Sequence, residues 1–121
     1  MNLTEPELQL GPHVMVPDIA GWKKERLPHP PSGNSIEVAP DWISEILSPS
    51  TVRIDRIRKM PQYAAFDVKH AWLIDSVAKT LEAFKLDRGG WKLLGTYGER
   101  DKVRVEPFDA VEIDLSVLWW D

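Results

Sequence analysis

Short runs of apolar and β-branched residues recur along the chain, and most of them have the length of a strand. The first two, Val14–Ala20 and Trp42–Leu47, are separated by a segment from Leu27 to Pro40 that carries four prolines. Apolar runs bounded by Pro, Gly and Ser are typical of strands, and proline-rich segments between them are typical of surface loops. We therefore predict two core strands joined by a loop, with Pro17 placing the first strand at an edge or a strand end.

The second half of the chain is also strand-like. The sequence Asp87-Arg88-Gly89-Gly90 lies between two of its apolar runs and is typical of a hairpin turn. The predicted strands here are Ala71–Asp75, Thr80–Leu86, Trp91–Tyr97, Val103–Pro107 and Ala110–Leu115.

One segment between these two halves has helical spacing. Ser50 or Thr51 can cap a helix there, and its apolar positions are Val52, Ile57, Met60 and Ala64. Pro61 falls within this pattern and should kink the helix or split it, because proline removes a donor and clashes with the preceding turn. The order strand, strand, helix, strand, hairpin predicts an α+β fold, a mixed sheet with a helix packed on one face.

Composition adds limits to this picture. A length of 121 residues predicts one domain spanning residues 1–121, and 43% hydrophobic with 28% charged residues is typical of soluble globular proteins. No apolar run approaches the roughly 20 residues that a membrane span needs, so we expect no membrane partner. The first residues lack the pattern of a secretory signal, which predicts a cytoplasmic protein.

The absence of cysteine excludes disulfides, thiolate nucleophiles and cysteine-rich zinc sites. A metal would need oxygen or imidazole ligands, which favours Mg²⁺ or Mn²⁺. The formal net charge of -4 argues against a protein that holds nucleic acid by charge alone. It does not argue against an enzyme whose site gathers carboxylates around a metal.

Two carboxylates occupy strand positions among apolar neighbours. On an extended strand Asp18 shares a face with Val14 and Val16, and Glu45 lies between two apolar residues of the next strand. Such carboxylates need a cation or a hydrogen-bond partner, so Asp18 and Glu45 are candidate metal ligands, with the Ile46 carbonyl as a further oxygen. Spacing alone leaves a second interpretation open, in which Asp18 closes a turn and Glu45 is exposed on an edge strand.

A longer set of motifs resembles one known family. They occur in order along nearly the whole chain: Val16-Pro17-Asp18-Ile19-Ala20-Gly21-Trp22, Glu25-Arg26-Leu27-Pro28, Ala39 to Thr51 with its Glu-Ile-Leu-Ser-Pro-Ser-Thr run, Asp55, Lys59-Met60-Pro61, Tyr63-Ala64, His70-Ala71-Trp72-Leu73-Ile74-Asp75 and Glu106-Pro107-Phe108-Asp109-Ala110-Val111. This pattern resembles the Uma-two family of restriction endonucleases, which is placed in the PD-(D/E)XK nuclease superfamily.

The resemblance implies a restriction-endonuclease-like fold and a set of site residues. Asp18 matches the superfamily's first aspartate and Glu45 its glutamate, while Lys59 matches the family's lysine on the following helix. The chain departs from the usual superfamily spacing at position 47, which is Leu. The implied activity is hydrolysis of phosphodiester bonds in DNA, with Mg²⁺ or Mn²⁺ held by Asp18, Glu45 and Ile46 and with Lys59 acting on the water or the phosphate.

Other chemistry-bearing residues have more ordinary interpretations. Lys59 can instead form a solvated helix pair with Asp55. The three histidines, His13, His29 and His70, have no ligand-like spacing. The tryptophans are expected to pack in the core or at an interface, with Trp119 and Trp120 docking at the C-terminus. The basic residues Arg53, Arg56, Arg58 and Lys59 either contact phosphates or form a solvated face.

Family members have a helix and a strand ahead of the Pro-Asp segment, and this chain starts at about that segment. The resemblance therefore implies an N-terminally shortened relative whose nuclease activity is weak or undetectable, with an exposed sheet edge that favours a homodimer or other self-association. Two other function classes stay open: an inactive module that binds nucleic acid or a protein partner, and a Trp-rich carbohydrate-binding domain. Metal binding at Asp18 and Glu45 separates the first from the enzyme, and a row of exposed tryptophans would mark the second.

Overall fold

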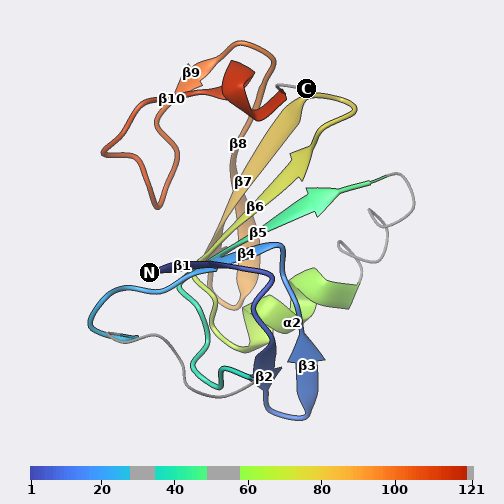
Figure 1. Cartoon of the computed structure of the whole chain (residues 1–121), viewed down its shortest axis with the longest axis vertical. Coiled ribbons are helices and arrows are strands. Elements are labelled where there is room, and N and C mark those ends of the chain that lie inside the picture. The colour runs from blue at the N-terminus through green and yellow to red at the C-terminus, as the bar shows by residue number, and fades with distance from the viewer. Residues whose placement is uncertain (28–34, 49–57, 120–121) are drawn as a thin grey trace.

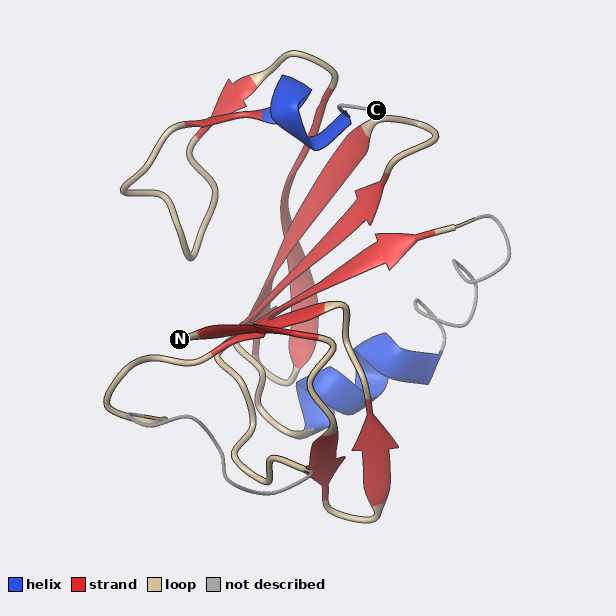
Figure 2. Ribbon diagram, viewed as in Figure 1, coloured by secondary structure: helices blue, strands red, loops and turns tan. Residues whose placement is uncertain are grey.

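A six-stranded sheet organises the chain (Figures 1 and 2). The computed structural model describes residues 1–27, 35–48 and 58–119. In spatial order the strands are β1 (Asn2–Thr4), β4 (Ile19–Gly21), β5 (Trp42–Leu47), β6 (His70–Asp75), β7 (Thr80–Asp87) and β8 (Gly90–Gly98). Strands β5 and β6 are parallel, and the other neighbours are antiparallel. The predicted α+β fold with a mixed sheet is confirmed.

Different elements cover the two faces of this sheet (Figure 1). Helix α2 (Met60–Ala65) and the hairpin of β2 (Leu8–Leu10) and β3 (His13–Met15) lie on one side, which we call the helix-side face. The other side, the opposite face, is covered by the C-terminal part of the chain, which contains β9 (Lys102–Val103), β10 (Ile113–Asp114) and the 3₁₀ helix η2 (Leu115–Trp119). Because side chains alternate along a strand, each face has its own hydrophobic cluster.

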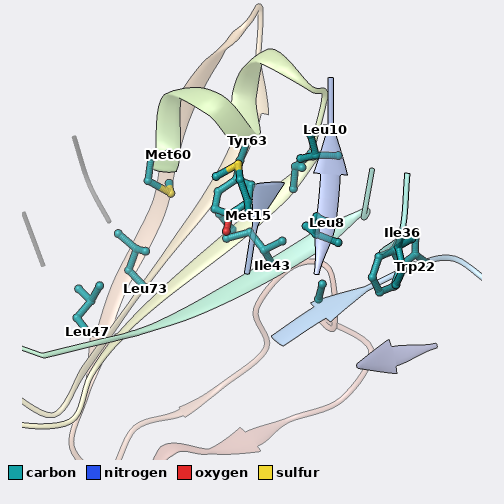
Figure 3. Packing of buried hydrophobic residues seen from close by; sticks show 13 residues of the cluster. Leu8, Leu10, Met15, Trp22, Ile36, Ile43, Leu47, Met60, Tyr63 and Leu73 are labelled. Atoms are coloured by element: carbon teal, nitrogen blue, oxygen red, sulfur yellow. The ribbon is translucent and has the colours of Figure 1, made fainter. Parts of the chain in front are cut away.

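The helix-side cluster joins three separate parts of the chain (Figure 3). Met60 and Tyr63 of α2 pack over Ile43 of β5 and Leu73 of β6, and Leu8 with its neighbours in the hairpin closes the cluster. All of these side chains are buried, and Tyr63, Leu8 and Ile43 have no exposed surface. The helix is therefore fixed against β5 by close packing.

The predicted strand Val14–Ala20 is wrong as a single element. It is divided into β3, which pairs with β2, and β4, which pairs with β5 in the main sheet. Pro17 lies between them and has no N–H to continue a ladder. Val14 and Val16, which were predicted to share a strand face with Asp18, are 56% and 46% exposed, so that face is not part of the core. The strands β1 and β2 were not predicted, because three residues are too few to show the alternation of apolar and polar residues that marks a strand.

The C-terminal strands are shorter than predicted. Of the predicted strand Val103–Pro107 only Val103 lies in a ladder, because β9 consists of Lys102 and Val103, and of Ala110–Leu115 only Ile113–Asp114 pairs with it. The Asp114 carboxylate accepts hydrogen bonds from the N–H and the hydroxyl of Ser116, which favours the turn into η2 over a longer strand.

Local sequence explains where helix α2 begins and where the hairpin turn between β7 and β8 forms. Pro61 lies in the first turn of α2, where its missing N–H costs little, and residues 49–57 of the predicted helix lie outside the described part of the chain. The predicted hairpin is confirmed: Asp87 pairs with Gly90, and Arg88 and Gly89 have the positive φ angles of 53° and 79° that a two-residue turn requires.

No helix of the described ranges is long and apolar enough to cross a membrane.

Candidate functional site

Strand β5 extends past the end of its neighbour β4, and Asp18 lies at that end. Strand β4 pairs with residues 42–44 of β5, so Glu45, Ile46 and Leu47 continue beyond the antiparallel ladder. The Ile46 N–H donates a hydrogen bond of 2.5 Å to Asp18 Oδ2. A strand residue directs its N–H and its C=O to the same edge, so the Ile46 carbonyl faces the side where Asp18 lies.

The carboxylate of Glu45 is almost completely buried on the helix-side face, with 2% of the residue exposed. Its Oε2 accepts a hydrogen bond from Lys59 Nζ at 2.9 Å, and its Oε1 accepts one from the Tyr63 hydroxyl at 3.0 Å. A buried charge is tolerated when it is paired and hydrogen-bonded in this way. The alternative that Glu45 is exposed on an edge strand is therefore wrong.

Lys59 immediately precedes the first residue of α2. Its side chain is 28% exposed, and its Nζ lies 3.4 Å from the Val16 carbonyl as well as 2.9 Å from Glu45. Leu47, in the place of the usual strand lysine, is buried in the helix-side cluster. Lys59 thus joins Glu45 to the segment that leads into Asp18, and the three predicted site residues gather at one end of β5.

Tyr63 belongs to this group and was not assigned a role from the sequence. Its hydroxyl contacts Glu45, and its ring is fully buried under α2 (Figure 3). Lys59 and Tyr63 are four residues apart, which places their side chains on one side of a helix. That spacing was a usable signal, because two donors on one helix face next to a buried strand glutamate can both reach its carboxylate.

The donor set fits a hard divalent cation with a small number of protein ligands. Asp18, Glu45 and the Ile46 carbonyl offer oxygen atoms, the type of ligand that Mg²⁺ and Mn²⁺ prefer. In the described part of the chain no group of three or more His, Asp or Glu side chains could hold a metal ion. Water molecules would therefore complete the coordination shell, as is usual for Mg²⁺.

His13 and His70 lie away from this site. His13 packs edge-on against Phe66 with ring centroids 6.3 Å apart, and His70 is on β6 next to Trp42 of β5. His29 lies outside the described residues.

The tryptophans behave as predicted for packing residues. Trp22, Trp42 and Trp72 are buried, and the half-buried Trp91 donates its indole N–H to the Met60 carbonyl at 2.8 Å. A carbohydrate-binding row of exposed tryptophans is not formed by these residues. Of the basic cluster, Arg53 and Arg56 lie outside the described residues, as do Asp55 and Trp120.

Comparisons with known proteins give the family and the fold of the chain. A family model described as "Putative restriction endonuclease", Uma2, matches residues 4–117. The chain belongs to the Uma2 family. Among solved structures, the chain is similar to one described as a putative nuclease belonging to DUF820 from Anabaena variabilis, with a TM-score of 0.76 and 24% identity. The match covers 98% of this chain and 66% of that one, just under two thirds of its length.

At 24% identity the structural match shows a shared fold. The family match shows that the chain belongs to a family described as restriction endonucleases. No curated protein matched the chain. The recognised resemblance to the Uma-two family and the restriction-endonuclease-like fold are thus confirmed.

Proposed function

We propose that this Uma2 protein is a metal-dependent DNA endonuclease in which Asp18, Glu45 and the Ile46 carbonyl hold one Mg²⁺ or Mn²⁺ ion. The ammonium group of Lys59 acts on the attacking water or on the phosphate, and Tyr63 positions Glu45. The observation that carries the proposal is the buried Glu45 carboxylate in contact with Lys59 at 2.9 Å, at the strand end where Asp18 meets Ile46. When bound, the ion supplies Lewis acidity that offsets negative charge on the phosphate and activates water.

Lys59 is placed to act on a phosphate group. Its ammonium group is fixed by Glu45 on one side, and with 28% of the side chain exposed it can also meet a substrate from solvent. A cation held in position before the substrate arrives stabilises the charge that develops on the phosphate oxygens without reorganising in the reaction. The role of Lys59 is therefore to orient the attacking water or to offset that charge.

Glu45 and Tyr63 have supporting tasks in this scheme. A carboxylate has about four acceptor positions, so hydrogen bonds from Lys59 and Tyr63 do not by themselves exclude a metal contact. The Tyr63 hydroxyl fixes one carboxylate oxygen from the buried side. This restricts the rotation of the Glu45 side chain.

The direct test measures metal binding and DNA cleavage together. We expect Asp18→Asn to weaken Mn²⁺ binding at least tenfold in calorimetric titrations and to reduce Mn²⁺-dependent plasmid cleavage by about a hundredfold or more. The matched control is Asp67→Asn, since Asp67 is an exposed carboxylate in a left-handed turn that asparagine tolerates. Equal Mn²⁺ binding by Asp18→Asn and the unmodified chain would contradict the assignment.

A second candidate function is an inactive nuclease-fold module that binds DNA or another partner. It is favoured by one observation: Lys59 and Tyr63 already satisfy the buried Glu45 carboxylate without a metal ion. DNA binding that is unchanged by Mn²⁺, with no strand cleavage and no effect of Asp18→Asn, would support this module and exclude the enzyme.

The proposed partners are DNA and a second copy of the chain. Strand β8 is nine residues long and ends the sheet order, so among the described residues one of its edges has no neighbouring strand, and its Leu93 is 50% exposed. Such an edge favours self-association by strand pairing. We propose a homodimer in the cytoplasm, and solution mass by light scattering tests its stoichiometry.

A further inference from the structure

A cavity of about 500 Å³ lies at the far end of the sheet from Asp18 and Glu45. Its floor includes the row Asn2, Gly21, Trp42, His70 and Lys85, which are register partners across five strands from β1 to β7. Register partners project to the same side of a sheet, so this row belongs to the opposite face. Trp42 and Glu45 are three residues apart on β5, roughly 10 Å along the strand, and point to opposite faces.

Flat apolar surfaces form the inner wall of this cavity. The buried Trp22 and Trp42 line it together with Pro107 and Phe108. Phe108 and Trp42 are packed edge to face, with ring centroids 4.9 Å apart and an interplanar angle of 87°. Cavities of about 300–1,000 Å³ with mainly apolar walls and a few polar groups are typical of small-molecule sites.

The polar groups around the cavity are mostly cationic. Lys23, Lys69 and Lys85 line it and are all exposed. Among the described lining residues Asp41 is the carboxylate, and it already accepts hydrogen bonds from Arg26 at 2.8 Å and from the Lys23 N–H at 2.7 Å. Lys69 pairs with the exposed Asp67 at 3.0 Å, and Lys85 Nζ lies 3.9 Å from the Glu106 carboxylate, so part of this charge is compensated. The Met1 ammonium group also lines the cavity, and the lining residues together still carry more positive than negative charge, which favours an anionic ligand.

Trp42 provides an independent indication of a ligand. It is 6% exposed, lines the cavity, and its indole N–H has no hydrogen-bond partner among the described residues. A buried donor without a partner is unfavourable, and native structures rarely leave one. The nitrogen itself has almost no accessible surface, so an acceptor atom on a bound molecule would satisfy it only after a small shift of the ring toward the cavity.

We propose that this cavity binds a mononucleotide, with the base against the tryptophan and phenylalanine walls and the phosphate near Lys85 and its neighbouring lysines. The base supplies a flat apolar surface and acceptor atoms, and the phosphate supplies the negative charge. This site is separate from the proposed nuclease site, and neither requires the other.

The test titrates AMP into the whole chain and follows the indole N–H resonances by NMR. We expect saturable binding that shifts the Trp42 signal, identified by its loss in Trp42→Phe, with AMP at least tenfold tighter than adenosine, ribose 5-phosphate or inorganic phosphate. Lys85→Ala should weaken AMP binding at least fivefold. Lys102→Ala, which changes an exposed lysine outside the cavity, should leave it unchanged, and so should Lys59→Met.

The proposal is overturned by each of three outcomes: no saturable AMP binding, equal binding of ribose 5-phosphate or phosphate, or AMP binding that Lys85→Ala leaves intact. AMP binding lost in Lys59→Met but kept in Lys85→Ala would place the nucleotide at the nuclease site and also overturn it. Lys85 is an exposed residue, so its substitution tests the cavity without endangering the fold.

Discussion

On the helix-side face of the sheet, the buried carboxylate of Glu45 accepts hydrogen bonds from both Lys59 and Tyr63. On the opposite face, Trp42 and Ser44 on the same strand each have a buried polar atom without a hydrogen-bond partner among the described residues. A single strand therefore carries a satisfied polar group on one side and unsatisfied ones on the other. A pre-formed network suits chemistry that needs fixed geometry, whereas an unsatisfied group on a side chain that lines a cavity, as Trp42 does, suits the binding of a ligand.

The largest expected effect is a loss of cleavage when Lys59 on the helix-side face is substituted, compared with no loss when Lys85 on the opposite face is substituted. Lys59→Met should leave Mn²⁺ binding within about threefold and reduce plasmid cleavage by about a hundredfold, because the cation that acts on the phosphate is lost. Lys85→Met, on the opposite face, should leave cleavage unchanged. Cleavage that survives in Lys59→Met and disappears in Lys85→Met would move the catalytic site to the opposite face. Circular dichroism of both variants checks that each is folded.

The next effect concerns the two tyrosines, one packed on each face. Tyr63→Phe should lower the free energy of unfolding by about 1–3 kcal/mol, since the buried Glu45 carboxylate loses a donor. It should also reduce cleavage, with most of the loss in kcat, because Glu45 is less well positioned. Tyr97→Phe is the matched control and should change the stability less, because Tyr97 is only half-buried. Urea unfolding measures the stability of both variants. Equal losses of stability would show that the hydrogen bond from Tyr63 to Glu45 does not contribute to the free energy of unfolding.

Acid should destabilise the opposite face through His70. Burial lowers the pKa of His70 below 6.5, and the Glu106 carboxylate, 3.5 Å from Nε2, offsets only part of this because the separation is long for a hydrogen bond. The unfolded chain therefore takes up a proton first, and stability falls as the pH decreases from about 6.5 through the lowered pKa.

We expect His70→Gln to remove part of that loss when urea unfolding is compared at pH 7.5 and pH 5.5. His13→Gln, an exposed position, should keep the pH dependence of the unmodified chain. An identical acid response in His70→Gln and the unmodified chain would remove His70 as its cause.

The smallest effect is expected at the start of η2, where Asp114 and Ser116 are exposed. Hydrogen bonds from Ser116 lower the pKa of Asp114. Ser116→Ala should raise that pKa toward its ordinary value, measurable by NMR titration of the carboxylate, and cleavage should not change. A pKa of Asp114 that stays low in Ser116→Ala would assign the shift to another neighbour.

The local elements of the fold follow from short stretches of sequence. The hairpin turn at Arg88-Gly89 was predictable because two adjacent positive φ angles select a small set of residues. Strand β5 was predicted with its observed bounds, since Pro40 and the Ser48-Pro49-Ser50 segment frame one apolar run. The burial of Glu45 between Ile43 and Leu47 follows from the two-residue period of a strand.

The candidate site was predicted from its sequence motif, but its contacts required the tertiary structure. Pro17 divides the segment that leads to Asp18, so Asp18 reaches Ile46 only because β4 pairs antiparallel with β5 and ends beside it. Lys59 and Tyr63 reach Glu45 only because α2 packs on that face. Residue type and period fix what a side chain prefers within its own strand or helix, whereas contacts between residues 14 to 28 positions apart depend on how the sheet and helix pack together.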